Sequence, residues 1–164
     1  MENISIVKDF IGKRVIVEKL LLAPRRLVWK AWTTASDLEK WWGPKEWPAS
    51  SKSFDFRVGG YWHYYMTGPD GTKAWGRIDY TAVEELEYFT GIDFFTDECG
   101  IKNTELPSTF WSVKFLDAGE GKTKVVVESR YATESDLQKI VDIGFEAGFT
   151  SALENLDELL AGNP

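Results

Sequence analysis

The apolar residues between positions 133 and 160 recur at spacings of three and four. This period places them on one wide stripe of an α-helix, and most charged residues of the segment lie outside the stripe. Thr133, followed three places later by Asp136, is similar to a capping box, and Gly162 is suited to end the helix. The pattern predicts one long C-terminal helix of about 40 Å, at about 1.5 Å per residue.

Two glycines, Gly144 and Gly148, lie on the apolar stripe of this predicted helix. Each costs about 1 kcal/mol relative to Ala in a helix interior, so a compensating feature is expected. Either the sheet approaches the helix closely at these positions, or the missing side chains leave room for a ligand beside Phe145 and Phe149. Of the two explanations, we favour close packing.

Most of the chain before this helix alternates between apolar and polar positions, which is typical of β-strands. A first strand is expected at 13–22, followed by a short helix that begins near Pro24 and a second that begins with a capping box at Ser36. Short connections, such as the turn at 68–71, indicate that neighbouring strands are antiparallel. The further strands are expected at 53–57, 61–67, 72–83, 86–95, 110–116 and 124–131.

This order of elements indicates the α+β class. A sheet of six or seven antiparallel strands twists and curves, so its concave face can hold the C-terminal helix while the other face meets water. No internal repeat, low-complexity segment or linker interrupts the chain. Residues 1–164 are therefore expected to form a single domain, with its core at about 13–160.

The net charge of −7 and the sequence pI near 4.8 argue against nucleic acid and against an anionic membrane as partners. The N-terminus lacks the basic and apolar regions of a signal peptide, and no run of about 18 apolar residues is present. A single cysteine, Cys99, excludes an internal disulfide and fits a reducing compartment. A cytoplasmic location is therefore expected.

Five segments carry a resemblance to a known superfamily. They read APRRLVWKAWT at 23–33, WWGP at 41–44, DFRVGG at 55–60, PDG at 69–71 and IGFEAGF at 143–149. Together they resemble the START-like superfamily, also called SRPBCC or Bet v 1-like, and within it the AHSA-like proteins, which are similar to the C-terminal domain of the activator of the heat-shock chaperone ATPase. The resemblance covers about 13–160. It implies a helix-grip fold, often with a cavity between helix and sheet, and no shared catalytic set.

Aromatic residues are abundant, with 8 Trp, 6 Tyr and 10 Phe. Buried aromatic rings supply a large apolar area, and several rings around one concavity suit a flat apolar or aromatic ligand. The alternative is an aromatic-rich core without a cavity. The residues that we expect to form the walls of a ligand site are Trp32, Trp62, Tyr64, Trp75, Phe94, Trp111, Phe145 and Phe149.

Strand 61–67 places Trp62, Tyr64 and Met66 on one face and His63 on the other. The resemblance implies polar residues at the position of His63, so the first set is expected to point inward and His63 outward. His63 is the only histidine, and no Cys pair, His-Glu-x-x-His or Gly-x-Ser-x-Gly motif is present. No catalytic residue, metal ligand or cofactor is therefore predicted.

Four charged residues lie within the predicted strands, namely Asp55, Arg57, Arg77 and Asp79. An arginine that points inward needs a charge partner and is able to anchor a ligand carboxylate. Such residues more often lie on the solvated face or form structural ion pairs. The sequence leaves both alternatives open for the two arginines.

Our leading hypothesis is a protein that binds a small hydrophobic or aromatic molecule between the helix and the sheet. A second is a protein-interaction module related to chaperone regulation, whose partner is a chaperone or another protein. A third is a cyclase- or hydratase-like enzyme that uses the cavity. A dry aromatic chamber favours the first, a solid core the second, and a buried pair of ionisable groups facing an open cavity the third. The ligand and the oligomeric state are left open.

Overall fold

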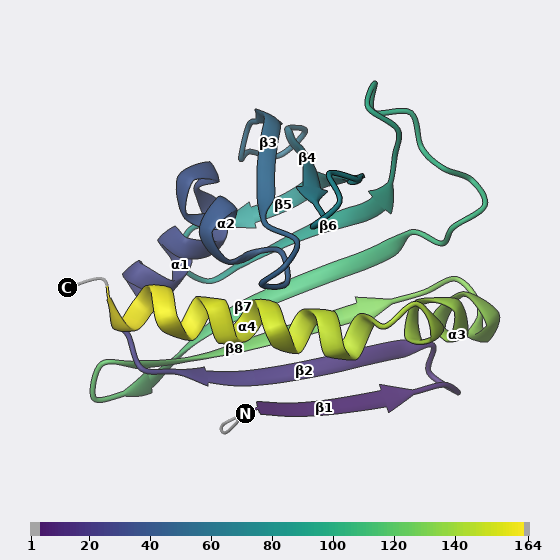
Figure 1. Cartoon of the computed structure of the whole chain (residues 1–164). Helices are drawn as coiled ribbons and strands as arrows, with labels where there is room; N and C mark the ends of the chain where they lie inside the picture. Colours follow the sequence, from purple (N-terminus) through teal and green to yellow (C-terminus); the bar gives the residue numbers. More distant parts are fainter. Residues whose placement is uncertain (1–3, 163–164) are drawn as a thin grey trace.

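One antiparallel sheet of eight strands dominates the computed structural model, which describes residues 4–162 (Figure 1). The strand order is β1-β2-β8-β7-β6-β5-β4-β3, so the N-terminal hairpin pairs with the last strand. The α+β class and the helix-grip arrangement are confirmed, with slightly more strands than predicted. The elements are β1 (Ile4–Asp9), β2 (Arg14–Leu21), α1 (Arg25–Thr33), α2 (Ala35–Trp41), β3 (Ala49–Phe54), β4 (Tyr61–Thr67), β5 (Lys73–Glu84), β6 (Tyr88–Phe95), β7 (Thr109–Gly119), β8 (Lys122–Arg130), α3 (Glu134–Asp142) and α4 (Phe145–Ala161).

The strand that the sequence did not predict is β1, at one edge of the sheet. It pairs with β2 along its whole length, from Ile4 opposite Lys19 to Asp9 opposite Arg14. Its two isoleucines pack against the core, whereas Val7 is 52% exposed. A short edge strand that is buried only in part carries a weak alternation, and its partner strand decides that it forms.

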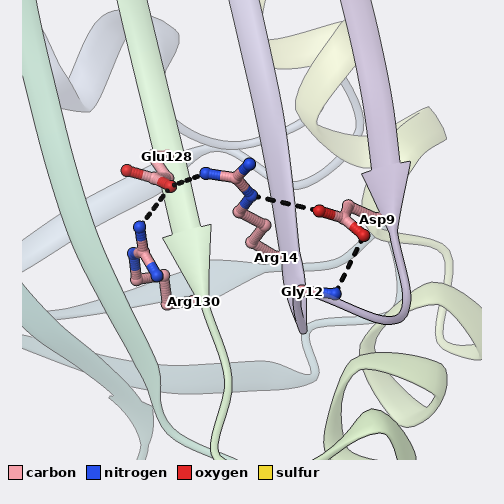
Figure 2. Close-up of polar contacts among 5 residues, drawn as sticks. All are labelled: Asp9, Gly12, Arg14, Glu128 and Arg130. Carbon is pink, nitrogen blue, oxygen red and sulfur yellow. Dashed lines mark hydrogen bonds and ion pairs between the residues drawn. The ribbon is translucent and has the colours of Figure 1, made fainter.

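A row of charged side chains joins β1, β2 and β8 (Figure 2). Arg14 Nε lies 3.2 Å from Asp9 Oδ2, and Arg14 Nη1 lies 2.8 Å from Glu128 Oε2. The same Glu128 oxygen also lies 2.9 Å from Arg130 Nη2. The Gly12 amide donates to Asp9 Oδ1, and this bond together with Arg14 lowers the pKa of Asp9. The alternation along β2 and β8 puts this row on the face opposite the buried valines, so it supports the sheet edge and not the concave side.

The strand β3 begins earlier than the sequence indicates, at Ala49 instead of position 53. Residues 55–60 form a corner after it, where the Asp55 amide donates to the Tyr61 carbonyl. A side chain at Gly60 would not fit, because its Cβ would lie 2.2 Å from the Asp55 carbonyl oxygen. The other predicted strands are present, with ends that shift by up to three residues.

The C-terminal segment forms two helices where the sequence predicted one. α3 ends at Asp142 and α4 begins at Phe145, with Gly144 between them at φ +93°. Glycine adopts this left-handed conformation without steric cost, so the apolar stripe continues across the junction although the helix does not. The predicted start is confirmed, because Thr133 Oγ1 accepts a hydrogen bond from the Asp136 amide. The long C-terminal helix is α4, with 17 residues.

Close packing explains neither glycine, so that preference is wrong. A Cβ at Gly144 would meet nothing within 4 Å, and one at Gly148 would lie 3.8 Å from Pro44 Cγ, which is an ordinary contact. Gly144 therefore provides the left-handed conformation of the backbone turn between α3 and α4. Gly148 occupies a regular helical position with room for a methyl group.

We expect Gly144→Ala to lower the free energy of unfolding by about 1–2 kcal/mol, because an L-residue is strained at this positive φ. Gly148→Ala is the matched control, since it makes the same change inside α4 and is expected to raise the free energy of unfolding by up to about 1 kcal/mol. Urea denaturation of the two variants measures the difference. Stabilisation by both substitutions would show that the break is not maintained.

The capping box predicted at Ser36 does not form. The helix α2 begins at Ala35, and no side chain caps its N-terminus. Asp37 is instead buried, and its carboxylate accepts a hydrogen bond from Lys30 Nζ at 3.1 Å. Glu39 accepts a hydrogen bond from the backbone amide of Ser51 in β3. Glu39, the acid that the capping-box pattern assigned to the helix start, therefore bonds to β3 instead.

The core lies between the concave face of the sheet and the helices. Trp32 of α1 is 1% exposed and stands in a cluster of rings from α2 and the sheet, with Trp41 at a centroid distance of 4.7 Å. None of the helices within residues 4–162 is long and apolar enough to cross a membrane. The residues that α4 buries are Phe149, Ala152, Leu153, Leu156 and Leu160.

Candidate ligand-binding cavity

A cavity of about 250 Å³ lies between the concave face of the sheet and the junction of α3 with α4. Strands β4 to β7 supply one side of it, and the residues around Gly144 supply the other. Ile143 borders the cavity and is 57% exposed, so the mouth lies at this junction. The lining residues are Tyr64, Met66, Ala74, Trp75, Gly76, Asp93, Phe94, Phe95, Thr109, Trp111, Tyr131, Ile140, Ile143, Gly144 and Phe145.

The register of the strands brings the inner side chains together. Tyr64 on β4 is opposite Gly76 on β5, which in turn is opposite Phe95 on β6. Gly76 leaves room for the tyrosine ring, because a Cβ there would lie 2.8 Å from the Tyr64 hydroxyl oxygen. Asp93, two residues before Phe95, faces the same side and is opposite Thr109 on β7. Four neighbouring strands thus form one continuous wall.

Among the described residues that line the cavity, Asp93 is the only acid, and none is a lysine, arginine or histidine. It is half-buried, and it borders the cavity. Within residues 4–162, no hydrogen bond or ion pair involves its carboxyl group. Burial raises the pKa of Asp93 to about 7, because apolar surroundings destabilise the ionised form. Near neutral pH, this carboxyl group is present in both its protonated and its ionised form.

Three tyrosines, Tyr64, Tyr80 and Tyr131, lie close enough to Asp93 for its charge to affect them. Burial raises the pKa of Tyr131 to about 12, and it also raises the pKa of Tyr64 and of Tyr80. The charge of Asp93 adds to each rise. The phenol groups therefore stay neutral around pH 7 and remain hydrogen-bond donors.

Five of the eight residues predicted as walls border the cavity, namely Tyr64, Trp75, Phe94, Trp111 and Phe145. The other three lie behind this lining. Trp62 stacks on the Tyr64 ring at 4.2 Å, Phe149 stacks on Phe145 at 5.5 Å, and Trp32 belongs to the core cluster. Trp62 and Phe149 therefore support rings that line the cavity.

The rings of Trp75 and Phe94 lie on the outer face of the sheet, although both residues border the cavity. Trp75 is directly opposite Tyr65 and contacts its ring at a centroid distance of 4.6 Å. Phe94 is directly opposite Arg77, whose guanidinium carbon lies 5.9 Å from the Phe94 ring centre. Residues that pair directly across strands share a face, so these rings point away from Asp93.

His63 lies on the outer face, as expected, but it is only 4% exposed. The loop after β6 covers it, and His63 Nε2 lies 3.2 Å from both Thr96 Oγ1 and the Asp97 carbonyl oxygen. Burial lowers the pKa of His63. These two contacts tie the His63 ring to the loop that covers it.

Both arginines in question also lie outside the cavity. Arg57 is exposed and pairs with Asp55 at 2.7 Å. Arg77 Nε lies 2.6 Å from Asp79 Oδ1, and its guanidinium group covers the Tyr61 ring. Neither arginine is placed to bind a carboxylate inside the cavity. In the described part of the chain, no three His, Cys, Asp or Glu side chains gather in a way that could hold a metal ion.

Asp93, Thr109 and Tyr131 are cavity residues that the sequence analysis did not single out. The alternation within 88–95 places Phe89, Asp93 and Phe95 on one face. A lone acid on an otherwise apolar face was therefore the available signal. The residues at the α3–α4 junction had no such signal, because a continuous helix was expected there.

The chain matches a known protein family over most of its length. Residues 22–161 match the family described as Activator of Hsp90 ATPase homolog 1-like protein. A comparison with curated proteins found no match.

Several solved structures are similar to this chain. A solution NMR structure from Arthrobacter aurescens is 36% identical with a TM-score of 0.91, over 96% of this chain and 91% of that chain. A crystal structure from Mycobacterium smegmatis is 34% identical with a TM-score of 0.88, over 96% of each chain. A solution NMR structure from Staphylococcus epidermidis is 28% identical with a TM-score of 0.83, over 98% of this chain and 95% of that chain. With the family match at 22–161, these likenesses show that the chain belongs to the START-like family of Activator of Hsp90 ATPase homolog 1-like proteins.

Proposed function

We propose that the chain binds a small, largely apolar molecule in the cavity between the sheet and the α3–α4 junction. The observation that carries this proposal is the lining, in which aromatic and aliphatic side chains surround a space of about 250 Å³. An apolar hollow with a few placed polar groups is the usual form of a small-molecule site. Each Å² of apolar ligand surface buried there contributes about 25 cal/mol to the transfer free energy.

The break in the C-terminal helix supports the same proposal. Gly144 borders the cavity, and the space beside its Cα is open. Phe145 begins α4 at the mouth, and its stacking on Phe149 holds the ring there. The backbone turn thus leaves space beside the cavity, and the stacked pair fixes one of the rings that line it.

Catalysis in the same cavity is a second candidate, and one observation favours it. Asp93, Tyr64 and Tyr131 are ionisable groups that border the cavity, and the pKa of Asp93 is about 7. A carboxyl group with such a pKa is suited to general acid–base chemistry near neutral pH. Conversion of the bound molecule to a product by the wild type, but not by Asp93→Asn, would distinguish an enzyme from a binding protein.

Native mass spectrometry of protein purified gently from its own host tests the proposed binding. A small molecule present at one copy per chain, and lost on denaturation, would support the proposal and give the mass of the ligand. A mass without ligand, unchanged after incubation with hydrophobic extracts, would contradict it. The protein-interaction module that the family description suggests would then be favoured.

Phe145→Trp is expected to weaken the binding of a small apolar probe, propylbenzene, by about 10-fold or more, because the larger indole overfills the cavity mouth. The binding is measured by NMR titration of isotope-labelled protein. Phe110→Trp is the control, since Phe110 is 48% exposed on the outer face and the probe should bind that variant as it binds the wild type. Unchanged affinity in Phe145→Trp would place the ligand elsewhere.

A further inference from the structure

Asp93 borders an apolar cavity, and among residues 4–162 no hydrogen bond or ion pair holds its carboxyl group. We infer that the cavity selects ligands that carry a protonated amine on an apolar body, with Asp93 as the anionic anchor. This inference rests on the proposed function, because it names the chemical class of the molecule bound there.

The first argument is the contrast between Asp93 and the other shielded acids of this protein. Bringing a carboxylate out of water is costly unless a cation or several donors compensate. Among the described residues, the cavity lining supplies neither lysine nor arginine to Asp93. Asp37 is the fully buried acid among the described residues, and Lys30 Nζ lies 3.1 Å from its carboxylate. The half-buried Asp79 and Asp157 pair with Arg77 and Lys19, and the half-buried Glu39 accepts a hydrogen bond from the Ser51 amide.

The second argument is the aromatic surroundings. Tyr64, Phe95, Trp111, Tyr131 and Phe145 all line the same space as the carboxyl group. The face of an aromatic ring attracts a cation, and the attraction increases where water is excluded. The same rings, together with the negative charge of the ionised Asp93, disfavour a carboxylate or a phosphate. An ammonium group is therefore the charged group that this lining stabilises best.

The protonation of Asp93 makes the inference testable. Binding of an ammonium group requires the ionised carboxylate, and the pKa of Asp93 is about 7. The ionisable groups that face Asp93 are Tyr64, Tyr80 and Tyr131, whose pKa values are all raised above 10, and α3 and α4 contribute only Ile140, Ile143, Gly144 and Phe145. Amine affinity is therefore expected to rise as the pH passes through 7, with release of a proton.

A protonated Asp93 would instead donate a hydrogen bond to a carbonyl oxygen of a neutral ligand. That arrangement predicts the opposite dependence, because the donor is lost as the pH rises through 7. The direction of the pH effect separates the two kinds of ligand.

The test compares three small probes of similar shape by NMR titration at pH 6 and pH 8. They are 2-phenylethylamine, neutral propylbenzene and the ketone phenylacetone. We expect 2-phenylethylamine to bind the wild type at least about 10-fold more tightly than propylbenzene at pH 8 and to bind about 10-fold more weakly at pH 6, since the ionised fraction of Asp93 falls by about this factor. Propylbenzene should bind with the same affinity at pH 6 and at pH 8.

Two variants complete the design. Asp93→Asn should remove the preference for the amine and its pH dependence while propylbenzene still binds. Asp142→Asn removes an exposed carboxylate beside the cavity mouth and should leave the amine preference intact.

Each remaining outcome is decisive. Equal affinity for the amine and propylbenzene, or tighter binding of phenylacetone at pH 6, would overturn the amine assignment while leaving the proposed binding function standing. Failure of all three probes to bind the wild type would overturn both. The pH dependence of the wild type decides the question even if Asp93→Asn fails to fold.

Discussion

The Asp93→Asn variant is expected to be more stable than the wild type at pH 8, by on the order of 2–4 kcal/mol. A pKa that rises from 3.8 to about 7 on folding corresponds to at most about 4 kcal/mol, at about 1.4 kcal/mol per pH unit. Water that enters the cavity reduces this value. The amide keeps the size of the side chain and removes the charge that the folded protein shields poorly.

The sign of the effect follows from proton binding. The raised pKa means that the folded protein holds a proton on Asp93 between about pH 4 and pH 7, where the unfolded chain has lost it. The wild type therefore loses stability as the pH rises through this window, and the loss is complete above about pH 8. At pH 4.5, the free energy of unfolding of Asp93→Asn should therefore exceed that of the wild type by only about 1 kcal/mol or less.

Urea denaturation at pH 4.5, 6 and 8 measures the difference in the free energy of unfolding between Asp93→Asn and the wild type. Asp142→Asn is the matched control, because it removes an exposed carboxylate. Its free energy of unfolding should differ from that of the wild type by a small amount that is the same at all three pH values. A variant that is less stable than the wild type at pH 8 would mean that the Asp93 carboxylate makes a stabilising contact. A stabilising Asp93→Asn would instead mean that the fold retains a carboxyl group at the expense of stability, as functional sites often do.

Trp32→Ala is expected to lower the free energy of unfolding by about 3–5 kcal/mol. Trp32 is 1% exposed, and its ring packs against Trp41, Trp42, Trp111 and Phe115 at centroid distances of 4.7 to 6.5 Å. Truncation leaves a cavity in the most crowded part of the core. The sequence analysis predicted this residue as a wall of the ligand site, but it does not border the cavity.

Trp32→Phe separates the contribution of ring packing from that of the indole N–H group. Within the described residues, Trp32 Nε1 is buried without a hydrogen-bond partner. A phenyl ring keeps much of the contact and removes this unpaired donor, so the expected loss is only about 1–2 kcal/mol. Thermal and urea unfolding of both variants give the two values. A loss in Trp32→Phe as large as that in Trp32→Ala would indicate that the N–H group makes a stabilising interaction.

The C-terminal helices illustrate what a local pattern predicts well and where it fails. The spacing of the apolar residues correctly predicts which side of the segment is buried, because the stripe depends only on the helical period. Gly144 has a low helix propensity but is compatible with both a helix and a turn. In the structure α3 ends at Asp142 and α4 begins at Phe145, and the local pattern does not decide between this turn and a continuous helix.

Asp93 shows a similar limit within the sheet. Alternation predicts that it shares a face with Phe89 and Phe95, and that assignment needs no tertiary information. Its chemistry depends on the neighbouring strands, where Ile78 and Thr109 lie directly opposite it, and the described residues that line the cavity include no lysine or arginine. The register across β5, β6 and β7 determines which side chains lie next to such an acid, and so whether a cation can pair with it.

The sequence by itself determined the α+β class, the helix-grip order of its elements, most strand positions and the aromatic character of the interior. These properties depend on periodicity, turn residues and composition, which neighbouring residues along the chain specify. The tertiary structure alone decided the edge strand β1, the break at Gly144 and, among residues 4–162, that no hydrogen bond or ion pair holds Asp93. The edge strand and the surroundings of Asp93 depend on pairing with other strands, which the local pattern does not specify.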